Sequence, residues 1–152
     1  MKRIAERMDS WGIYASAQLS YDPNREKNLE INKYKNEVKS IIEQNNIEKF
    51  IDIYALPAYA KYDLGIYYEK RFRRSKKLAY DTVKAVDNGK LRSSIINVFY
   101  IPETKNEELV TFTSKKLSTV SIKLMISEEI LCDDALLDQL VINLTQELIK
   151  NA

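Results

Sequence analysis

The feature that most constrains the fold of this 152-residue chain is a stretch of helical periodicity with cations on one side. Residues 70–77 read Lys-Arg-Phe-Arg-Arg-Ser-Lys-Lys, and six of these eight side chains are cationic. At about 100° per residue, the apolar residues in and around this segment form one stripe: Leu64, Tyr68, Phe72, Ala79, Val83 and Val86. The pattern predicts a long basic amphipathic helix over about 58–87, with Phe72 buried and Arg73 exposed.

Two shorter helical patterns precede this segment, and a stop signal follows it. Apolar residues recur at helical spacing over residues 23–45 and again over residues 47–54, with Asn45 and Asn46 between them. Asn88-Gly89 is expected to end the basic helix, because glycine adopts the left-handed conformation readily. The same dipeptide is also typical of a hairpin turn, but the helical period upstream favours a helix stop.

The pattern changes near residue 94 from helical to strand-like. Ile95–Ile101 is β-branched and aromatic, Leu109–Thr113 alternates partly, and Val120–Ile126 alternates cleanly between apolar and polar residues. These segments predict a small antiparallel three-strand meander over about 94–127 with one polar face. A C-terminal helix is expected over about 133–150.

Helices, then strands, then a final helix are typical of an α+β fold with helices on one side of a small sheet. The length suits one domain covering residues 1–152, and the change in composition near residue 90 is the only candidate boundary of a subdomain. Asp133 or Asp134 is expected to cap the last helix.

The composition excludes several kinds of catalytic site. The chain has no histidine and a single cysteine, Cys132, which rules out Ser-His-Asp and Cys-His catalysis, histidine metal sites and an intrachain disulfide. Its three glycines are isolated, so no glycine-rich phosphate loop is present. We therefore expect no enzymatic activity, no catalytic residues, no metal and no cofactor. The lone cysteine favours a reducing, cytoplasmic location, and the absence of a long apolar run argues against a membrane partner.

The charge pattern indicates a contact surface. Net charge is only +2, so a local patch, and not the whole molecule, would attract an anionic partner. The predicted contact residues combine the cations opposite the apolar stripe with two tyrosines off it: Lys70, Arg73, Arg74, Lys77, Lys84, Tyr67 and Tyr80. Such a surface can meet nucleic-acid phosphates, an acidic protein surface or only solvent.

Two further features have alternative interpretations. The acidic group from Glu128 to Asp138 offers oxygen ligands for a cation, but charges at a helix N-terminus explain it equally. Cys132 is either a reactive thiol or an inert one, because the nearby helix start lowers a thiol pKa while neighbouring carboxylates raise it.

Taken together, the missing catalytic residues and the tyrosine- and arginine-rich surface favour a non-enzymatic subunit of a larger assembly, binding copies of itself or other proteins. A virus-particle component, such as a phage head–tail connector, is one example of this class. The alternative is a nucleic-acid-binding subunit of a defence or replication complex, using the basic helix over residues 70–84.

Overall fold

The computed structural model describes residues 23–25, 28, 30–101 and 108–150. Within them the helices are α2 (Lys33–Asn45), α3 (Arg73–Val86), α4 (Leu109–Lys116), α5 (Glu128–Cys132) and α6 (Asp134–Lys150), with a 3-10 turn η1 (Gly89–Leu91). The strands are β1 (Lys49–Ala55), β2 (Leu64–Glu69), β3 (Ile96–Ile101) and β4 (Val120–Ile126). The expected α+β class is confirmed.

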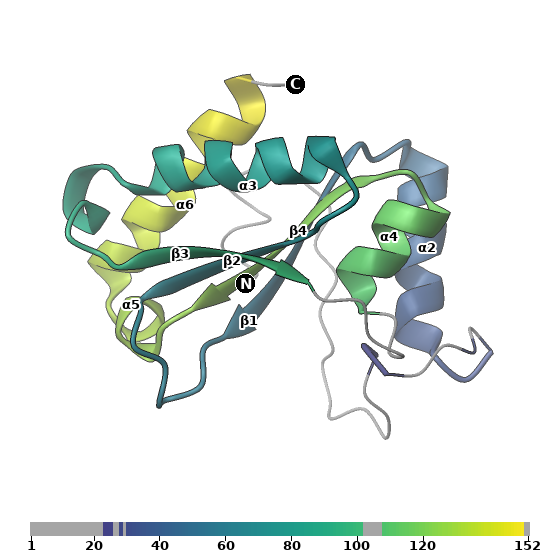
Figure 1. The fold of residues 1–152 in the computed structure, drawn as a ribbon, viewed down its shortest axis with the longest axis horizontal. Coiled ribbons are helices and arrows are strands. Elements are labelled where there is room, and N and C mark those ends of the chain that lie inside the picture. The colour runs from purple at the N-terminus through teal and green to yellow at the C-terminus, as the bar shows by residue number, and fades with distance from the viewer. Residues whose placement is uncertain (1–22, 26–27, 29, 102–107, 151–152) are drawn as a thin grey trace.

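The four strands form one mixed sheet in the order β1-β4-β2-β3 (Figure 1). β1 is parallel to β4, β2 is parallel to β3, and the central pair β2 and β4 is antiparallel. Strands from before and after residue 90 therefore share one sheet. This topology places residues that are about 70 positions apart, such as those of β1 and β4, side by side.

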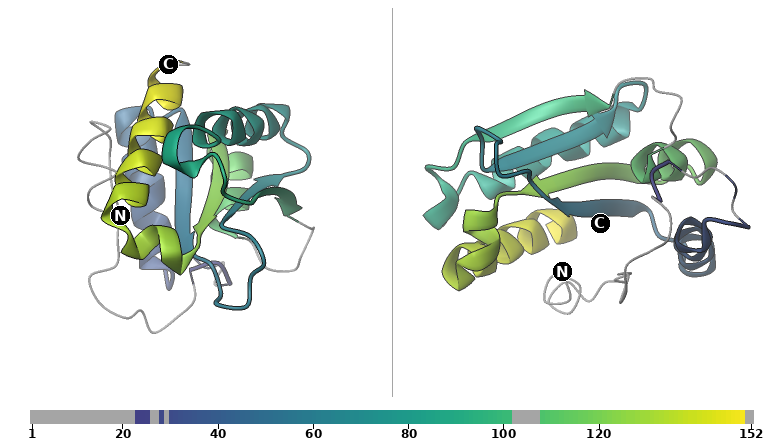
Figure 2. Two further views of the ribbon diagram at one scale, coloured as in Figure 1. Left: turned by 90° about the vertical axis from the view of Figure 1, so that its left-hand side faces the viewer. Right: turned by 90° about the horizontal axis from the view of Figure 1, so that it is seen from below.

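One face of the sheet is apolar and covered by helices. Side chains of β2 and β4 that point to this face are fully buried, among them Leu64, Ile66 and Leu124. They pack against Leu78 of α3 and Leu140 of α6 in the main hydrophobic cluster. Figures 1 and 2 show α3 and α6 together on this side of the sheet, so the core lies between these helices and the strands.

A second, smaller cluster joins α2 to α4. Val38 and Ile42 of α2 contact Leu109 and Phe112 of α4, and all four side chains are buried. α2 begins after Asn32, whose side chain accepts a hydrogen bond from the amide of Lys35, and ends at Asn46 in the left-handed conformation. The expected helix end at Asn45-Asn46 is thus confirmed, but the helix starts at Lys33 and not near residue 23 as expected. The pair of helices lies at one end of the sheet (Figure 1).

The basic helix is shorter than predicted. α3 begins at Arg73, and Leu64–Glu69, which the helical stripe included, is strand β2. Apolar residues at 64, 66 and 68 also fit a period of two, and pairing with strands on both sides satisfies their backbone groups. Phe72 is consequently the residue before the helix and only half-buried, contrary to the expected full burial, while Arg73 is exposed as expected.

Two short segments also differ from expectation. Residues expected to form a short helix over 47–54 instead form β1, and Leu109–Thr113, expected as a strand, lies in α4. The three-strand antiparallel meander is therefore replaced by β3 and β4 with a helix between them, in a sheet that includes β1 and β2. Short apolar runs fit either period, and here the sheet pairing decides.

Several local predictions are confirmed. β3 and β4 match the expected strands closely, and the C-terminal helix α6 covers the expected residues. Gly89 has a positive φ of 59° just after α3, as a stop signal requires. Asp133 Oδ1 accepts hydrogen bonds from the amides of Ala135 and Leu136, so Asp133 is the cap of α6.

Candidate functional site

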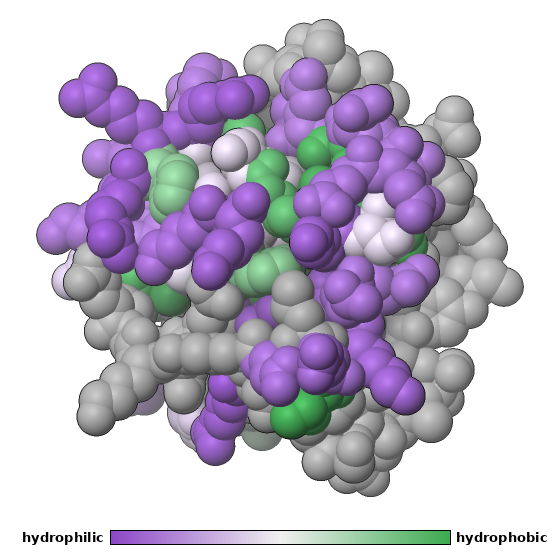
Figure 3. Space-filling model, turned by 90° about the vertical axis from the view of Figure 1, so that its right-hand side faces the viewer, coloured by the Kyte–Doolittle hydropathy of each residue, from purple (hydrophilic) through white to green (hydrophobic). Residues whose placement is uncertain are grey.

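The predicted contact residues do not form a single surface. Arg73, Arg74 and Lys77 lie in the first turns of α3, Lys84 lies in its last turn, and all four are exposed. Lys70 is also exposed but follows the end of β2, outside the helix, where its ammonium lies 5.3 Å from the ring centroid of Tyr100. Figure 3 views this side of the molecule and shows hydrophilic residues gathered over its upper and central part.

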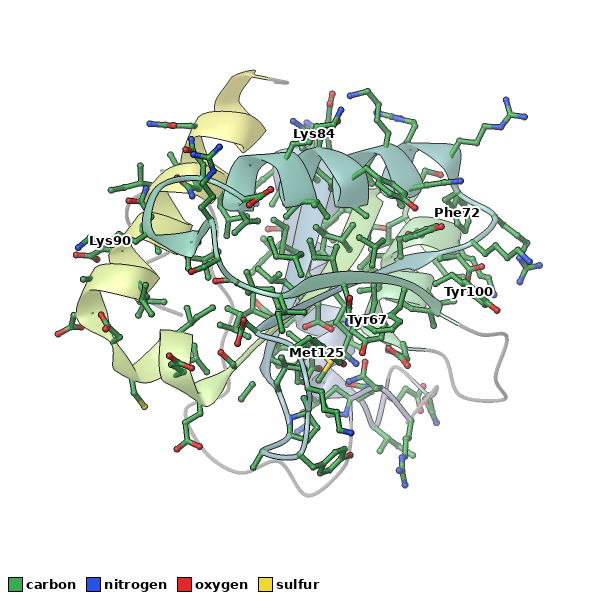
Figure 4. The ribbon with its side chains drawn as sticks, turned by 60° about the vertical axis from the view of Figure 1, so that its left-hand side comes forward. Tyr67, Phe72, Lys84, Lys90, Tyr100 and Met125 are labelled. Carbon is green, nitrogen blue, oxygen red and sulfur yellow. The ribbon has the colours of Figure 1, made fainter. Side chains whose placement is uncertain are left out.

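The two predicted tyrosines lie on different sides of the molecule. Tyr80 is 47% exposed on α3, and the ammonium of Lys76 lies 6.0 Å from its ring centroid. Tyr67 instead belongs to β2 and projects from the sheet face opposite α3. Figure 4 shows Tyr67 and Met125 on one side of the sheet and Lys84 on the other. Tyr67 therefore does not belong with the cations of α3.

The structure brings a different set of residues together on the second face of the sheet. The strand register aligns Asp52 of β1 with Lys123 of β4, Lys123 with Tyr67 of β2, and Tyr67 with Phe99 of β3. Because directly paired residues point to the same face, these four side chains form one row across the sheet. We call this set the charged row, and it is the candidate functional site.

Lys123 lies in the middle of the charged row and is held by two contacts. Its ammonium is 3.2 Å from Glu108 Oε2, just before α4, and 4.7 Å from the ring centroid of Tyr54. Its side chain is only 16% exposed, so this ion pair is partly shielded from water. A partly buried charge that is held from two sides has a well-defined position, which suits ligand recognition.

Asp52 is the most perturbed group of the site. It is 7% exposed, and its Oδ2 atom has no hydrogen-bond partner among the residues that the structure describes. Burial raises the pKa of Asp52 from 3.8 to about 7; the nearby Lys123 and a hydrogen bond with Tyr54 lower it, while Glu108 raises it. An acid with a pKa near 7 and an unsatisfied buried oxygen is an unusual feature in a fold, and such features gather at functional sites.

Asn24 ties the region before α2 to the charged row. Its side-chain Nδ2 donates to the hydroxyl of Tyr54 at 2.7 Å, and its Oδ1 accepts from the amide of Leu109 at 2.9 Å. One side chain therefore fixes both Tyr54 and the start of α4. Burial, followed by the charge of Asp52, raises the pKa of Tyr34 in α2, which places that phenol near the same site.

An aromatic cluster forms the other half of the row. Tyr67 stacks on Phe99 with ring centroids 4.8 Å apart, and Tyr62 lies 5.5 Å from Phe99 in a tilted arrangement. The hydroxyls of Tyr62 and Tyr67 are 2.9 Å apart, and burial followed by this hydrogen bond raises the pKa of Tyr67. Gly65 leaves room for both rings, since an added Cβ would lie 2.9 Å from a ring carbon of each.

The remaining sequence candidates do not join this site. Cys132 is exposed at the end of α5, and the acidic residues beside it flank the starts of α5 and α6, where Asp133 acts as a cap. In the described part of the chain, no three histidine, cysteine, aspartate or glutamate side chains form a group that could hold a metal ion. Each helix in that part is too short or too polar to cross a membrane.

Comparison with known proteins identifies the fold. No protein-family model matches the sequence, and no curated protein matches it either. A chain from the structure of the CwlD amidase of Clostridioides difficile in complex with the GerS lipoprotein aligns with 98% of this chain and 80% of its own length, at 15% identity and a TM-score of 0.65. A protein–protein complex is thus recorded for a chain of similar fold.

Two further solved structures are similar over the larger part of this chain. The N-acetylmuramoyl-L-alanine amidase AmiC2 of Nostoc punctiforme aligns with 74% of it at 15% identity and a TM-score of 0.54. The catalytic domain of CwlV, an amidase of the same kind from Bacillus (Paenibacillus) polymyxa var. colistinus, aligns with 77% at 12% identity and a TM-score of 0.59. The chain spans 62% and 64% of these two chains.

This likeness corrects the function expected from the sequence. The chain shares its fold with cell-wall amidases, which contradicts the interpretation as a structural subunit of a virus particle and the expectation of a protein without enzymatic activity. The alternative of a subunit built for nucleic-acid binding falls with that interpretation. The sequence-based exclusions covered histidine chemistry, cysteine chemistry and glycine-rich phosphate loops, and an enzyme fold does not depend on those features alone.

The charged row was missed because its members look ordinary in the sequence. Asp52 interrupts an apolar run, and Lys123 occupies a polar position of an alternating strand. The sequence offered one signal for the site: each of two strand-forming segments has a charged residue at its middle, Asp52 in the first and Lys123 in the second. Only the parallel pairing of β1 with β4 shows that the two charges are neighbours.

Proposed function

We propose that this protein binds a cell-wall fragment containing an N-acetylmuramoyl-L-alanine linkage on its charged row, and that the row acts on the amide bond. Two observations support the proposal. The protein shares its fold with amidases that are named for this linkage, and the side chains of the charged row have suitable chemistry. The identity of 12 to 15% carries the fold alone, so the residues of this chain must carry the rest of the argument.

The observation that carries the proposal is the buried Oδ2 of Asp52, which has no hydrogen-bond partner in the described part of the chain and lies next to Lys123. An unsatisfied buried oxygen destabilises the free protein and is satisfied when a ligand supplies a donor. An amide N–H or a sugar hydroxyl is such a donor. Lys123 beside it offers a positive charge for the carbonyl or carboxylate oxygen of the same ligand.

Amide hydrolysis matches what these two side chains provide. Water adds its oxygen to the carbonyl carbon, the C–N bond breaks, and the nitrogen leaves with an additional proton. Because its pKa is about 7, Asp52 is partly ionised near neutral pH. Its carboxylate form takes one proton from the attacking water, and the resulting carboxylic acid gives that proton to the leaving nitrogen. The ammonium of Lys123 stabilises the negative charge that develops on the carbonyl oxygen.

The aromatic half of the row suits the sugar part of the ligand. Tyr62, Tyr67 and Phe99 present half-buried rings beside the charges. Flat aromatic rings with a polar edge bind one apolar face of a sugar and keep hydroxyls available for its polar groups. A sugar and an amide joined to it would then lie along the row, over Tyr67 and Lys123 respectively.

The test uses a soluble N-acetylmuramoyl-L-alanyl peptide with the parent protein and the variants Asp52→Asn and Lys123→Met. Calorimetry measures binding, and chromatography measures release of the free peptide amine. We expect the parent to bind and cleave the peptide. Both variants should bind it at least tenfold more weakly than the parent, and Asp52→Asn should release no amine. Lys84→Ala, on the other side of the sheet, is the matched control and should behave like the parent.

Three outcomes would contradict the proposal. A folded parent that neither binds nor cleaves the peptide would remove it altogether. If the parent and both variants bind and cleave the peptide equally well, the site must lie outside the charged row. Binding without amine release would leave the ligand in place and remove the catalytic role of Asp52.

Four sequence-based expectations stay predictions. The contact residues on α3 are not part of the charged row and need a separate assay, and so do the expected homo-oligomer and the expected contact with a nucleic-acid backbone. The cytoplasmic location also stays a prediction, which cell fractionation with detection of the protein would test.

A further inference from the structure

Two groups of exposed charges of opposite sign lie apart on this molecule, and we call them its basic end and its acidic end. The basic end lies where β2 turns into α3 and contains Lys70, Arg73, Arg74 and Lys76. The acidic end lies at α5 and the start of α6 and contains Glu128, Glu129, Asp133 and Asp134. Figure 1 shows α5 toward the left of the molecule and the turn from β2 into α3 on the right of the sheet, at the other end of α3 from η1, so the two groups lie apart.

The acidic end is explained by its own helices. Glu128 and Glu129 lie in the first turn of α5, and Asp133 caps α6 through two backbone hydrogen bonds. Negative charge at a helix N-terminus is favoured by the helix dipole. These carboxylates are nonetheless exposed, so they remain accessible to a cation from outside.

The basic end has no such explanation. Arg73 and Arg74 begin α3, a helix with no acidic residue in its first turn and no capping side chain. Cations at this position oppose the helix dipole, which destabilises the isolated molecule. Both guanidinium groups are exposed and form no ion pair with the residues that the structure describes, whereas Lys77 is paired with Asp81 and Arg71 with Glu69. An external anion would relieve this repulsion.

A second copy of this chain supplies the matching anion. The net charge of +2 gives little long-range attraction for a large polyanion, but each copy carries the exposed carboxylates of the acidic end. Exposed Tyr80 and Tyr100 flank the basic end, and exposed Ile142 lies on α6 beyond the acidic end. Tyrosine and arginine are the residues enriched where protein interfaces carry their energy.

We infer that this protein associates head to tail, with the basic end of one copy docked on the acidic end of the next. Because the two surfaces differ, the contact is heterologous and extends into a ring or a filament. It uses neither the charged row nor its ligand, so it stands independently of the proposed cell-wall function.

The experiment is a charge swap between the two ends. One variant carries Arg73→Glu and Arg74→Glu, and the other carries Glu128→Lys and Glu129→Lys. Light scattering coupled to size-exclusion chromatography measures mass at about 20 mM and about 500 mM salt, since screening at high salt weakens exposed ion pairs. Far-UV circular dichroism checks that each variant is folded, and Arg73→Gln with Arg74→Gln replaces the first variant if charge reversal unfolds it.

We expect the parent mass to rise with concentration at low salt and to fall to that of one chain at high salt. Each charge-reversed variant alone should remain a single chain, and an equimolar mixture of the two should recover the parent mass. Lys84→Glu reverses one charge on the same helix but outside the basic end, and it should associate like the parent. A parent protein that remains a single chain at low salt overturns the inference, even if it binds polyphosphate. An equimolar mixture of the two charge-reversed variants that fails to associate overturns it as well.

Discussion

The two faces of the sheet use the same four strands for opposite purposes. On the face under α3 and α6, Ile66 and Leu124 are fully buried among other aliphatic side chains. On the other face, Asp52 and Lys123 lie beside Tyr67 in positions only one residue away along each strand. Successive side chains of a strand point to opposite faces, so each strand contributes to both.

The two faces of the sheet differ in what they contribute to the protein: one stabilises the fold, and the other offers groups that can contact a ligand. Burial of apolar area on the helix-covered face stabilises the fold without specifying any ligand. The opposite face buries a carboxyl that lacks one hydrogen-bond partner, which destabilises the fold and prepares a ligand contact. Removing a buried leucine from the first face should therefore lower stability, whereas replacing the carboxyl of Asp52 on the second face should raise it at pH values above 7.

The largest effect is expected for Leu124→Ala on the helix-covered face. Removing a fully buried leucine side chain leaves a cavity, and the free energy of unfolding should fall by about 4 kcal/mol. Urea unfolding followed by circular dichroism measures the loss. Met125→Ala, the next residue and half-buried on the other face, should lose less than half as much. Equal losses would mean that the two faces do not differ in packing.

The opposite sign is expected for Asp52→Asn. The folded protein holds a proton on Asp52 with a pKa of about 7 that the unfolded chain releases near pH 3.8. The stability that this proton contributes is fully present below about pH 4 and is lost as pH rises through 7. The variant should remove this pH dependence and be more stable than the parent at pH 8 by about 2–3 kcal/mol. Urea unfolding at pH 5 and pH 8 tests this, and parallel pH profiles for the two proteins would contradict it.

A smaller loss is expected for Gly65→Ala beneath the aromatic cluster. The added methyl group would lie 2.9 Å from ring carbons of Tyr62 and Tyr67, so both rings must move. We expect a loss of about 1–2 kcal/mol and a changed near-ultraviolet circular dichroism signal. Adding Tyr62→Ala to this variant removes one of the two clashes, and a double mutant that shows no coupling would contradict the contact.

The smallest effect is expected at the start of α3. Arg73→Ala should change the free energy of unfolding by less than about 0.5 kcal/mol, because the side chain is exposed and forms no ion pair with described residues. Phe72→Ala should cost about 1–2 kcal/mol, less than for a core phenylalanine, since Phe72 is half-buried before the helix. Thermal melts compare the two, and a larger loss for Arg73→Ala would reverse this interpretation of the helix start.

Strong and local signals were sufficient for part of the fold. The long period of α6 and its cap at Asp133 predicted the C-terminal helix, and Gly89 predicted the end of α3. The clean alternation of Val120–Ile126 predicted β4 and its two different faces. Each of these features depends on residues within a few positions of one another, so no distant contact was needed to specify them.

Short apolar segments and the candidate site depended on distant contacts. Residues 47–54 and 109–113 carry patterns that fit either a helix or a strand, and only pairing with β4 made the first a strand while packing on α2 kept the second a helix. The charged row exists because β1 and β4 are parallel neighbours, which brings Asp52 beside Lys123. The raised pKa of Asp52 needs burial as well, and a residue becomes buried only when the whole chain has folded around it.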